Sequence, residues 1–284
     1  MSDTLNAGMR EFWNGEGGHR WVRFQHRLDQ SLVGFGQAAM EAAAFSTGEQ
    51  VMDIGCGCGD TSFEIARQVG PNGHVKAVDI SEPILAQAIT RVGAEEVQNI
   101  SFEHGDAQTH RFEATAFDAV FSRFGIMFFD DPVAAFSNIR KALKHDGRLA
   151  FICWQPVKAN TWVSLPLTVV GNHLPLPLPP GPEEPGPFSF GDADKLERVL
   201  VEAGFSDVLI KSCDTPFTVA ADDNEAAAFL MQMGPANGAI SEADADEATK
   251  SLISAELREA LMPYRTEQGI VLDAATWVVT AYNR

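Results

Sequence analysis

The stretch that decides the fold reads Val51-Met52-Asp53-Ile54-Gly55-Cys56-Gly57-Cys58-Gly59-Asp60. A short apolar run ends in an acid and three glycines at alternate positions, and a helix-like sequence follows. Glycine has no Cβ, so such a loop turns sharply from a strand into a helix and lets its backbone come close to a ligand. The pattern therefore predicts a buried strand, a ligand-binding loop and a helix in direct succession.

A second acid stands at a matching place further along the chain. Asp79 closes the run His74-Val75-Lys76-Ala77-Val78-Asp79, which reads as the next strand. A carboxylate at the end of that strand is placed to accept hydrogen bonds from ribose hydroxyls. The two acids and the glycines together outline an α/β half-domain that binds a nucleoside.

The spacing of the glycines indicates which nucleoside ligand fits. A dinucleotide fingerprint has the pattern Gly-x-Gly-x-x-Gly, with a helix N-terminus facing the pyrophosphate. Here the third glycine comes one residue early, at Gly59, and Asp60 stands where the fingerprint has glycine. An acid beside a pyrophosphate would repel it, so the pattern disfavours NAD and favours a ligand without phosphates.

The acid and glycines from Asp53 to Gly59 resemble the first motif of the class I S-adenosylmethionine-dependent methyltransferases. Four further motifs follow in order: Asp79 with Ile80, Gly105-Asp106-Ala107, Phe117 to Ser122, and Leu143 to Phe151. The resemblance covers about residues 45–155. It implies that Asp79 holds the ribose, that Ile80 packs on the adenine and that Asp106 meets the adenine amino group. The implied cofactor-binding residues are Asp53, Gly55, Cys56, Gly57, Gly59, Asp79, Ile80, Asp106, Ala107, Ser122 and Trp21.

Strands and helices alternate along the chain, which predicts a mainly parallel sheet with helices on both faces. We expect a Rossmann-like sheet of seven strands, of which the last runs antiparallel in the family. The expected strands are about 50–55, 74–79, 99–104, 117–122, 148–154, 206–213 and 276–282. The expected helices begin near Thr61 with a Thr61–Glu64 capping box, at Ser81 with Pro83 in the first turn, over 132–144 behind Asp131, and from Asp192 to Ala203.

We interpret residues 1–284 as a single elaborated domain. Its expected parts are a helical N-terminal cap at 1–45, a cofactor-binding core at 46–155, a proline-rich insertion at 156–190 and a C-terminal half at 191–284 with a helical lid at 222–265. The insertion is too rich in proline for a helix. It reads as a lid over the substrate pocket or as a polyproline segment that binds a partner. The lid at 222–265 reads as one or two helices.

Composition excludes several classes of protein. A net charge of −18 repels phosphate backbones, so we expect no nucleic acid as substrate. We find no apolar stretch of membrane-spanning length and no secretory signal pattern. Four cysteines do not make a disulfide framework in a chain of 284 residues, and the pair Cys56 and Cys58 lacks a second ligand pair for zinc. We therefore expect no metal and a cytoplasmic location, while the oligomeric state stays open.

The sequence predicts a methyltransferase that acts on a small, partly apolar metabolite and converts S-adenosylmethionine to S-adenosylhomocysteine. The stretch from Ser122 to Phe129 is similar to the branch with the ubiquinone and menaquinone C-methyltransferases. Weak candidates for a catalytic role are His19, as a base, and Arg123, which binds an acidic group or forms an interior salt bridge. The expected pocket walls are Phe124, Phe128 and Trp154. A non-catalytic nucleoside-binding protein is the alternative, and an NAD-linked oxidoreductase is a weaker one.

Overall fold

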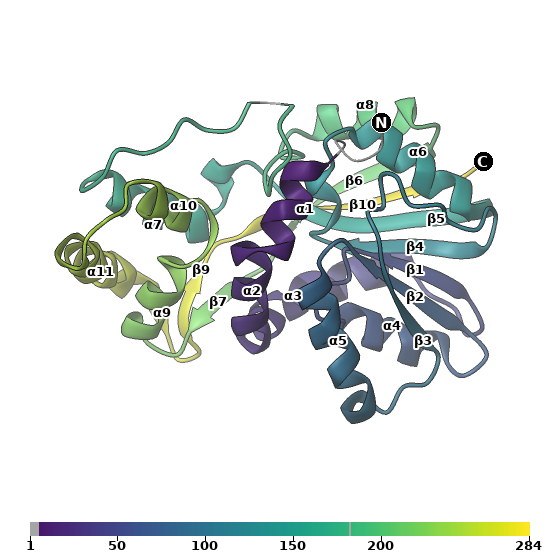
Figure 1. The fold of residues 1–284 in the computed structure, drawn as a ribbon, viewed down its shortest axis with the longest axis horizontal. Helices are drawn as coiled ribbons and strands as arrows, with labels where there is room; N and C mark the ends of the chain where they lie inside the picture. Colours follow the sequence, from purple (N-terminus) through teal and green to yellow (C-terminus); the bar gives the residue numbers. More distant parts are fainter. Residues whose placement is uncertain (1–5, 182) are drawn as a thin grey trace. The chain divides into compact units, whose positions relative to one another are not determined.

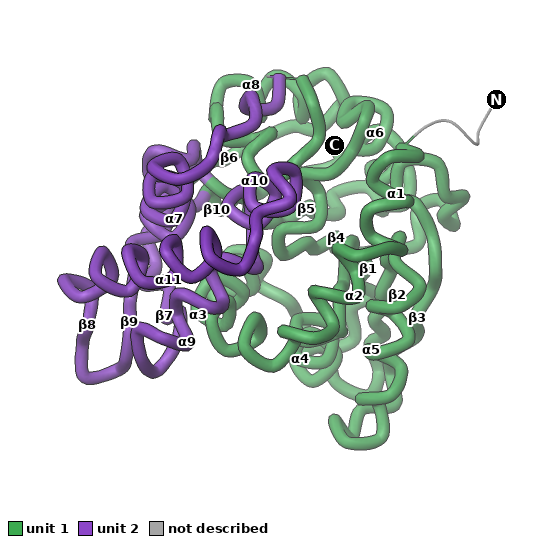
Figure 2. The backbone as a smooth tube through the Cα atoms, turned by 60° about the vertical axis from the view of Figure 1, so that its left-hand side comes forward, with its two compact units in different colours: residues 1–154, 182–213, 277–284 green, residues 155–181, 214–276 purple. Residues whose placement is uncertain are grey.

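The computed structural model describes residues 6–181 and 183–284, which fall into two compact units. The first, called here the sheet unit, comprises residues 1–154, 182–213 and 277–284, and the second, called the helical unit, comprises residues 155–181 and 214–276. Figure 2 colours the sheet unit green and the helical unit purple. The interpretation of the whole chain as one elaborated domain stays a prediction.

A seven-stranded sheet forms the centre of the sheet unit, in the order β3-β2-β1-β4-β5-β10-β6 (Figure 1). The pairs of β1 with β2 and β4, of β2 with β3 and of β4 with β5 are parallel. β10 runs antiparallel to β5, because Asp146 bonds to Asn283 near one end whereas Gln155 bonds to Ala275 near the other. The strands are β1 (Gln50–Ile54), β2 (His74–Asp79), β3 (Ile100–His104), β4 (Phe117–Arg123), β5 (Leu143–Trp154), β6 (Ser206–Asp214) and β10 (Ala275–Tyr282). The predicted Rossmann-like, mainly parallel sheet is confirmed.

Helices cover both faces of this sheet (Figure 1). Right-handed crossovers place the helices that connect β1, β2 and β3 on one face, and those that follow β4 and β5 on the other. The strand order reverses between β1 and β4, so the carboxyl ends of these two strands are where an open α/β sheet binds ligands. The helices are α1 (Ala7–Asn14), α2 (Glu16–Arg23), α3 (Gln25–Ala43), α4 (Asp60–Val69), α5 (Glu82–Glu95), the short η1 (Ile126–Phe128), α6 (Pro132–Ala142) and α8 (Ala193–Glu202).

The predicted helix starts are confirmed to within one residue, and one predicted cap is wrong. The side chains of Ser81, Asp131 and Asp192 accept backbone N–H bonds at the starts of α5, α6 and α8. The Thr61–Glu64 capping box does not form, because α4 begins one residue earlier, at Asp60, behind Gly59. α6 is shorter than expected and β5 longer, because the chain is already extended at Leu143.

The N-terminal 45 residues were expected to be helical, and the described part of them forms α1, α2 and α3. Residues 1–5 lie outside the described residues. The breaks between these helices fall at Gly15 and Phe24, so the segment is three helices rather than one.

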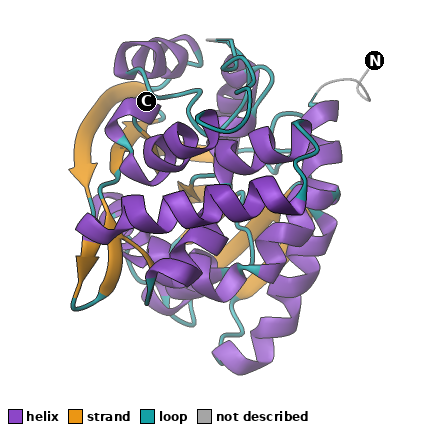
Figure 3. Ribbon diagram, turned by 90° about the vertical axis from the view of Figure 1, so that its left-hand side faces the viewer, coloured by secondary structure: helices purple, strands orange, loops and turns teal. Residues whose placement is uncertain are grey.

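The helical unit departs furthest from the sequence-based expectations. Residues 161–171, expected to be non-helical, form a helix around a single proline, because the other prolines of the insertion cluster beyond Pro175. The 222–265 segment forms three α-helices instead of one or two. The elements are η2 (Val157–Ala159), α7 (Thr161–Gly171), β7 (Phe217–Ala220), α9 (Asp223–Leu230), α10 (Gly234–Glu242), α11 (Glu247–Leu261), η3 (Met262–Tyr264), β8 (Arg265–Thr266) and β9 (Gly269–Leu272). The three strands form a small antiparallel sheet, β7-β9-β8; Figure 3 colours strands orange and helices purple.

Candidate functional site

The glycine-rich loop, defined here as residues 55–59, connects β1 to α4. The amides of Gly55 and Cys56 donate to the carbonyl of Val78 at 2.8 and 3.1 Å, which ties the loop to the end of β2. Gly55 has a φ of 66°, and a Cβ there would lie 2.6 Å from the Cα of Gly125. The loop therefore packs backbone to backbone against the turn after β4, and only glycine fits at position 55.

Asp53 is completely buried on β1 and holds the start of α4. Its Oδ2 accepts hydrogen bonds from the hydroxyls of Thr61 at 3.0 Å and Ser62 at 2.5 Å. Burial raises the pKa of the Asp53 carboxyl to about 6, although the two hydroxyls lower it. Its Oδ1 is buried and has no hydrogen-bond partner among the described residues. Asp53 thus fixes the first turn of α4, directly after the glycine-rich loop, to β1.

Asp79 ends β2 directly beside the glycine-rich loop. One carboxylate oxygen accepts from the Gly57 amide at 2.8 Å, and the other accepts from the Ser81 amide at 2.9 Å. Burial raises the pKa of Asp79, and the hydrogen bonds from Ser81 and Gly57 counteract part of that rise. A carboxylate has about four lone-pair positions, so both oxygens retain capacity to accept from ligand hydroxyls.

Asp106 follows β3 and lies at the same edge of the sheet as Asp79, because β2 and β3 are parallel neighbours. One of its oxygens accepts from the side-chain amide of Asn6 at 3.3 Å. The other oxygen is buried without a hydrogen-bond partner among the described residues, 3.6 Å from a guanidinium nitrogen of Arg10. The edge thus presents two acids, one of which has an unused acceptor atom.

The N-terminal helices close over the turn between β2 and α5. The side chain of Asn14 donates to the Ile80 carbonyl at 3.0 Å and accepts from the Glu82 amide at 2.9 Å. The Ser81 hydroxyl donates to the Trp13 carbonyl at 2.6 Å. Sequence reasoning missed Asn14, because a polar residue within an unassigned helical segment follows no motif.

Three aromatic side chains gather where this cap meets the glycine-rich loop. A Cβ built on Gly57 would lie 3.5 Å from the indole nitrogen of Trp21. Trp13 packs edge-on against Trp21 and against Phe128, with ring centroids 5.9 and 5.2 Å apart. Trp21 and Phe128 therefore lie near the loop, where a ligand-contacting role was expected for each.

Ser122 and Arg123, at the end of β4, are both used inside the protein. The Ser122 hydroxyl is fully buried and donates to the Ile54 carbonyl at 2.7 Å. Arg123 pairs with Asp60 at 2.8 Å and with Asp29 at 3.8 Å. Of the two roles left open for Arg123, the geometry favours the interior salt bridge. Ser122 binds the backbone at Ile54, directly before the glycine-rich loop.

The side chains of Phe124 and Trp154, expected as pocket walls, stack on each other. Their ring centroids are 4.2 Å apart at an interplanar angle of 10°, and Phe35 packs edge-on against both. All three rings are buried. Phe124 has a φ of 61°, which is strained for a bulky residue. The pair fills the interior at the carboxyl ends of β4 and β5.

Two further predicted contacts, Ile80 and Ala107, bear on the site through their backbone. The Ile80 carbonyl is the acceptor for Asn14, and the Ala107 carbonyl accepts from Asn138 at 2.9 Å. The cofactor role of their side chains stays a prediction.

The weak catalytic candidate His19 is exposed on α2. One of its ring nitrogens lies 2.8 Å from the carbonyl of Gly15, the residue directly before α2. The structure therefore does not bring His19 together with the acids at the sheet edge.

The two cysteines of the glycine-rich loop are buried. Burial raises the pKa of the Cys56 thiol well above its usual range and that of Cys58 to about 12, so both are protonated near neutral pH. In residues 6–181 and 183–284, no three His, Cys, Asp or Glu side chains gather as a metal site.

Comparisons with known proteins agree on one kind of domain. Residues 51–147 match a family model described as a methyltransferase domain. Aklanonic acid methyltransferase from Streptomyces sp. (strain C5) is 38% identical over 121 residues, covering 42% of this chain and 54% of that protein. Demethylmenaquinone methyltransferase from Staphylococcus saprophyticus is 27% identical over 183 residues, covering 61% of this chain and 77% of that protein. The match thus spans about half the length of the first relative.

Solved structures show the same fold. Phosphoethanolamine N-methyltransferase 2 from Haemonchus contortus, in complex with S-adenosyl-L-methionine, matches with a TM-score of 0.58 at 18% identity. The match covers 96% of this chain and 59% of that one. Among the helices of the described residues, none has the length and apolar character needed to cross a lipid bilayer.

Proposed function

With a match to a methyltransferase domain at residues 51–147 as the premise, we propose that the chain uses S-adenosylmethionine to methylate a small, partly apolar metabolite. The observation that carries the proposal is the pair formed by Asp79 and the glycine-rich loop, joined by the Gly57 amide at 2.8 Å. This pair places a carboxylate acceptor beside a backbone cradle, as a ribose requires.

The side chains at the sheet edge fit S-adenosylmethionine. Asp79 offers acceptors for hydroxyl groups, and the Asp106 oxygen that accepts no hydrogen bond among the described residues is a buried acceptor for an amino group, 3.6 Å from Arg10. Asp53 and Asp79 flank the loop, while the charge of Asp60 is paired with Arg123 at 2.8 Å, so the acids beside the loop favour a cation over a pyrophosphate. The cofactor supplies, when bound, an electrophilic methyl group on a positively charged sulfur.

The proposed contribution of the protein is binding and orientation. The glycine-rich loop and Asp79 hold the nucleoside half, while Trp21 and the cap exclude water from the site. Holding reactants in line supplies much of the acceleration in such a displacement. We assign no general base, because a ring nitrogen of His19 lies against the Gly15 carbonyl.

The acceptor class rests on composition and on relatives. The relatives described above are named for aklanonic acid and for demethylmenaquinone. We propose a small acceptor with an apolar, ring-containing body, because Trp13, Trp21 and Phe128 offer aromatic surface beside the loop. The net charge of −18 supports the view that nucleic acid is not the acceptor. A reducing, cytoplasmic location is supported by four cysteines that form no disulfide among the described residues.

The test is calorimetric titration with S-adenosylmethionine, S-adenosylhomocysteine and NADH in parallel. We expect micromolar binding of the two adenosyl-sulfur ligands and none of NADH. Binding of NADH alone would contradict the proposal and favour an oxidoreductase. Binding of S-adenosylmethionine without turnover on any quinone or phenol in an acceptor screen would favour the non-catalytic alternative.

The cap contact of Asn14 gives a prediction of its own. Asn14→Ala removes two hydrogen bonds between α1 and the turn after β2. We expect about three- to tenfold weaker binding of S-adenosylhomocysteine, the loss of roughly 1 kcal/mol. Limited proteolysis within residues 6–45 should also be faster. Asn172→Ala, in the helical unit, is the control, and equal effects of the two substitutions would contradict a role of the cap in ligand binding.

A further inference from the structure

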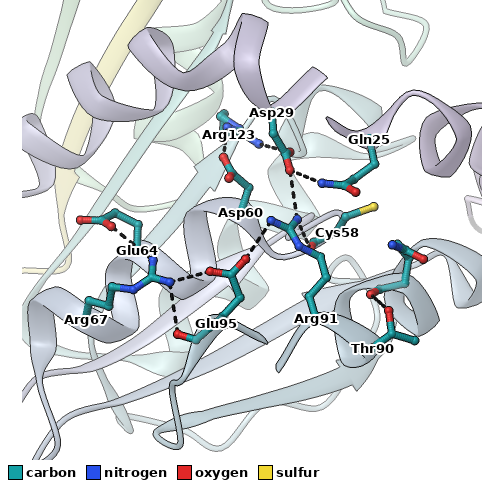
Figure 4. Close-up of polar contacts among 11 residues, drawn as sticks. Gln25, Asp29, Cys58, Asp60, Glu64, Arg67, Thr90, Arg91, Glu95 and Arg123 are labelled. Carbon is teal, nitrogen blue, oxygen red and sulfur yellow. Dashed lines mark hydrogen bonds and ion pairs between the residues drawn. The ribbon is translucent and has the colours of Figure 1, made fainter. Parts of the chain in front are cut away.

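A chain of ion pairs runs behind the glycine-rich loop (Figure 4). It joins residues of α3, α4, α5 and the end of β4, all in the sheet unit. Its members in order are Asp60, Arg123, Asp29, Arg91, Glu95, Arg67 and Glu64. The sequence analysis singled out Asp60, Glu64 and Arg123 for other reasons and did not predict that they are linked.

Asp29, on α3, is the centre of this chain. Its carboxylate accepts from Arg91 at 3.0 Å and lies 3.8 Å from Arg123. The side chain of Gln25, one turn earlier on α3, also donates to it. The side chain of Asp29 is only 18% exposed, so solvent screens these contacts weakly.

The two arginines connect Asp29 to the C-terminal end of the glycine-rich loop and to the first residue of α4. Arg91 donates from the same nitrogen to the Cys58 carbonyl at 2.9 Å, which is a backbone atom of the loop. Arg123 donates to Asp60, the first residue of α4, at 2.8 Å. Asp29 thus contacts two arginines, of which Arg91 binds the backbone at Cys58 and Arg123 binds the side chain of Asp60.

The same helix also determines where the aromatic cap lies. α3 continues from α2 across Phe24, and α2 carries Trp21, whose indole nitrogen lies against Gly57. Only eight residues separate Trp21 from Asp29 in the sequence. Fixing Asp29 to Arg91 and Arg123 therefore fixes the cap and the loop to each other.

Stability alone does not account for this arrangement. Burial, followed by the nearby charge of Asp60, raises the pKa of Asp29, so ionisation of this carboxyl is less favourable in the folded protein than in water. Buried ion pairs of this kind commonly contribute little net stability. Without Asp29, Arg91 would still pair with Glu95 and Arg123 with Asp60, so both arginines keep a partner.

We propose that Asp29 is a positioning residue for cofactor binding, which sets the glycine-rich loop and Trp21 in register through Arg91 and Arg123. The proposal rests on the proposed function for its ligand. It predicts that removing the negative charge of Asp29 weakens cofactor binding clearly while the melting temperature of the protein changes little.

The test compares Asp29→Asn with Glu64→Gln in the full chain. Glu64 lies at the outer end of the same ion-pair chain, 45% exposed, and pairs with Arg67 without contacting the loop. For Asp29→Asn we expect roughly tenfold weaker binding of S-adenosylhomocysteine by calorimetry, with Tm within about 3 °C of the native protein. Amide hydrogen exchange at residues 55–60 of the free protein should rise by about tenfold. Glu64→Gln should change none of these measurements.

A second variant keeps the proposal testable if Asp29→Asn does not fold. Arg91→Lys keeps the charge but loses the planar fork, in which one nitrogen donates to Asp29 and Cys58 while the other pairs with Glu95, so it should raise exchange at 55–60 in the same direction. Unchanged loop exchange in both variants would overturn the proposal, whatever ligand the native protein binds. Failure of the native protein to bind S-adenosylhomocysteine would count against the proposed function alone, since the exchange measurement needs no ligand.

Discussion

Replacing Gly55 with alanine is expected to destabilise the sheet unit by roughly 2–5 kcal/mol. Part of the loss is the left-handed backbone, which costs an L-residue about 1–2 kcal/mol. The rest is overlap, because the new Cβ would lie 2.6 Å from the Cα of Gly125, a backbone atom that no side-chain rotation can move. The free energy of unfolding in urea, followed by far-ultraviolet circular dichroism, measures the loss.

Gly48 provides the matched control for this substitution. It also has a positive φ, of 91°, but an added Cβ there would meet nothing within 4 Å. Gly48→Ala should therefore show the backbone cost alone, about 1–2 kcal/mol. If Gly55→Ala and Gly48→Ala lose the same free energy, the close approach of the two loops is not what requires glycine at position 55.

The strands and the glycine-rich loop could be predicted because their signal is local. Buried parallel strands read as short apolar runs, and the acid-glycine pattern after Ile54 marks where the first of them ends. Asp79 ends β2 and Asp106 follows β3, and the two lie at one edge of the sheet because the ends of parallel strands meet there. Their roles toward a ligand stay predictions.

Contacts between distant segments could not be predicted in this way. Asp29 lies 62 residues from Arg91 in the sequence, and neither residue belongs to a recognisable pattern. Asn14 likewise contacts Ile80 across 66 residues. Such pairs depend on how helices pack on the finished sheet, and a single sequence carries no local trace of that packing.

Burial decided the outcome for the residues after β4. Position alone placed Ser122 and Phe124 at the ligand-binding edge, and both side chains are buried there, so their roles toward a ligand stay predictions. Sequence position gives the edge of a sheet on which a residue lies, but the neighbouring layer decides whether its side chain reaches solvent. Phe35 on α3 supplies that layer for Phe124.

The number and bounds of the helices in the helical unit could not be predicted for a different reason. α9 and α10 have only eight and nine residues, and helices that short are stabilised mainly by tertiary packing. Their boundaries therefore carry a weak sequence signal, although the Gly234-Pro235 pair marks the start of α10. The proline content of the whole insertion led to the prediction that no helix forms there, and α7 was therefore not expected. Packing of its apolar side chains, rather than helix propensity, stabilises α7.

Asp79→Ala is expected to weaken binding of S-adenosylmethionine and S-adenosylhomocysteine by roughly ten- to a hundredfold, the loss of one or two charge-assisted hydrogen bonds. The substitution also leaves the Gly57 and Ser81 amides without their acceptor, so the loop loses part of its own support. Asp79→Asn separates these effects, because its amide oxygen still accepts from one backbone N–H while the negative charge is gone. Calorimetry on both variants measures the affinities.

The control for this prediction is Asp118→Ala. Asp118 also accepts from a backbone amide, that of Gln50 at 2.9 Å, but Gln50 is the first residue of β1 and so marks the opposite edge of the sheet. Removing Asp118 should therefore leave both affinities unchanged while costing stability. A folded Asp79→Ala protein with native affinity would overturn the ribose assignment, and the glycine-rich loop would then bind its ligand without the acid that ends β2. A loss in Asp79→Ala but not in Asp118→Ala would tie the affinity to the carboxyl edge of the sheet, where the acids converge.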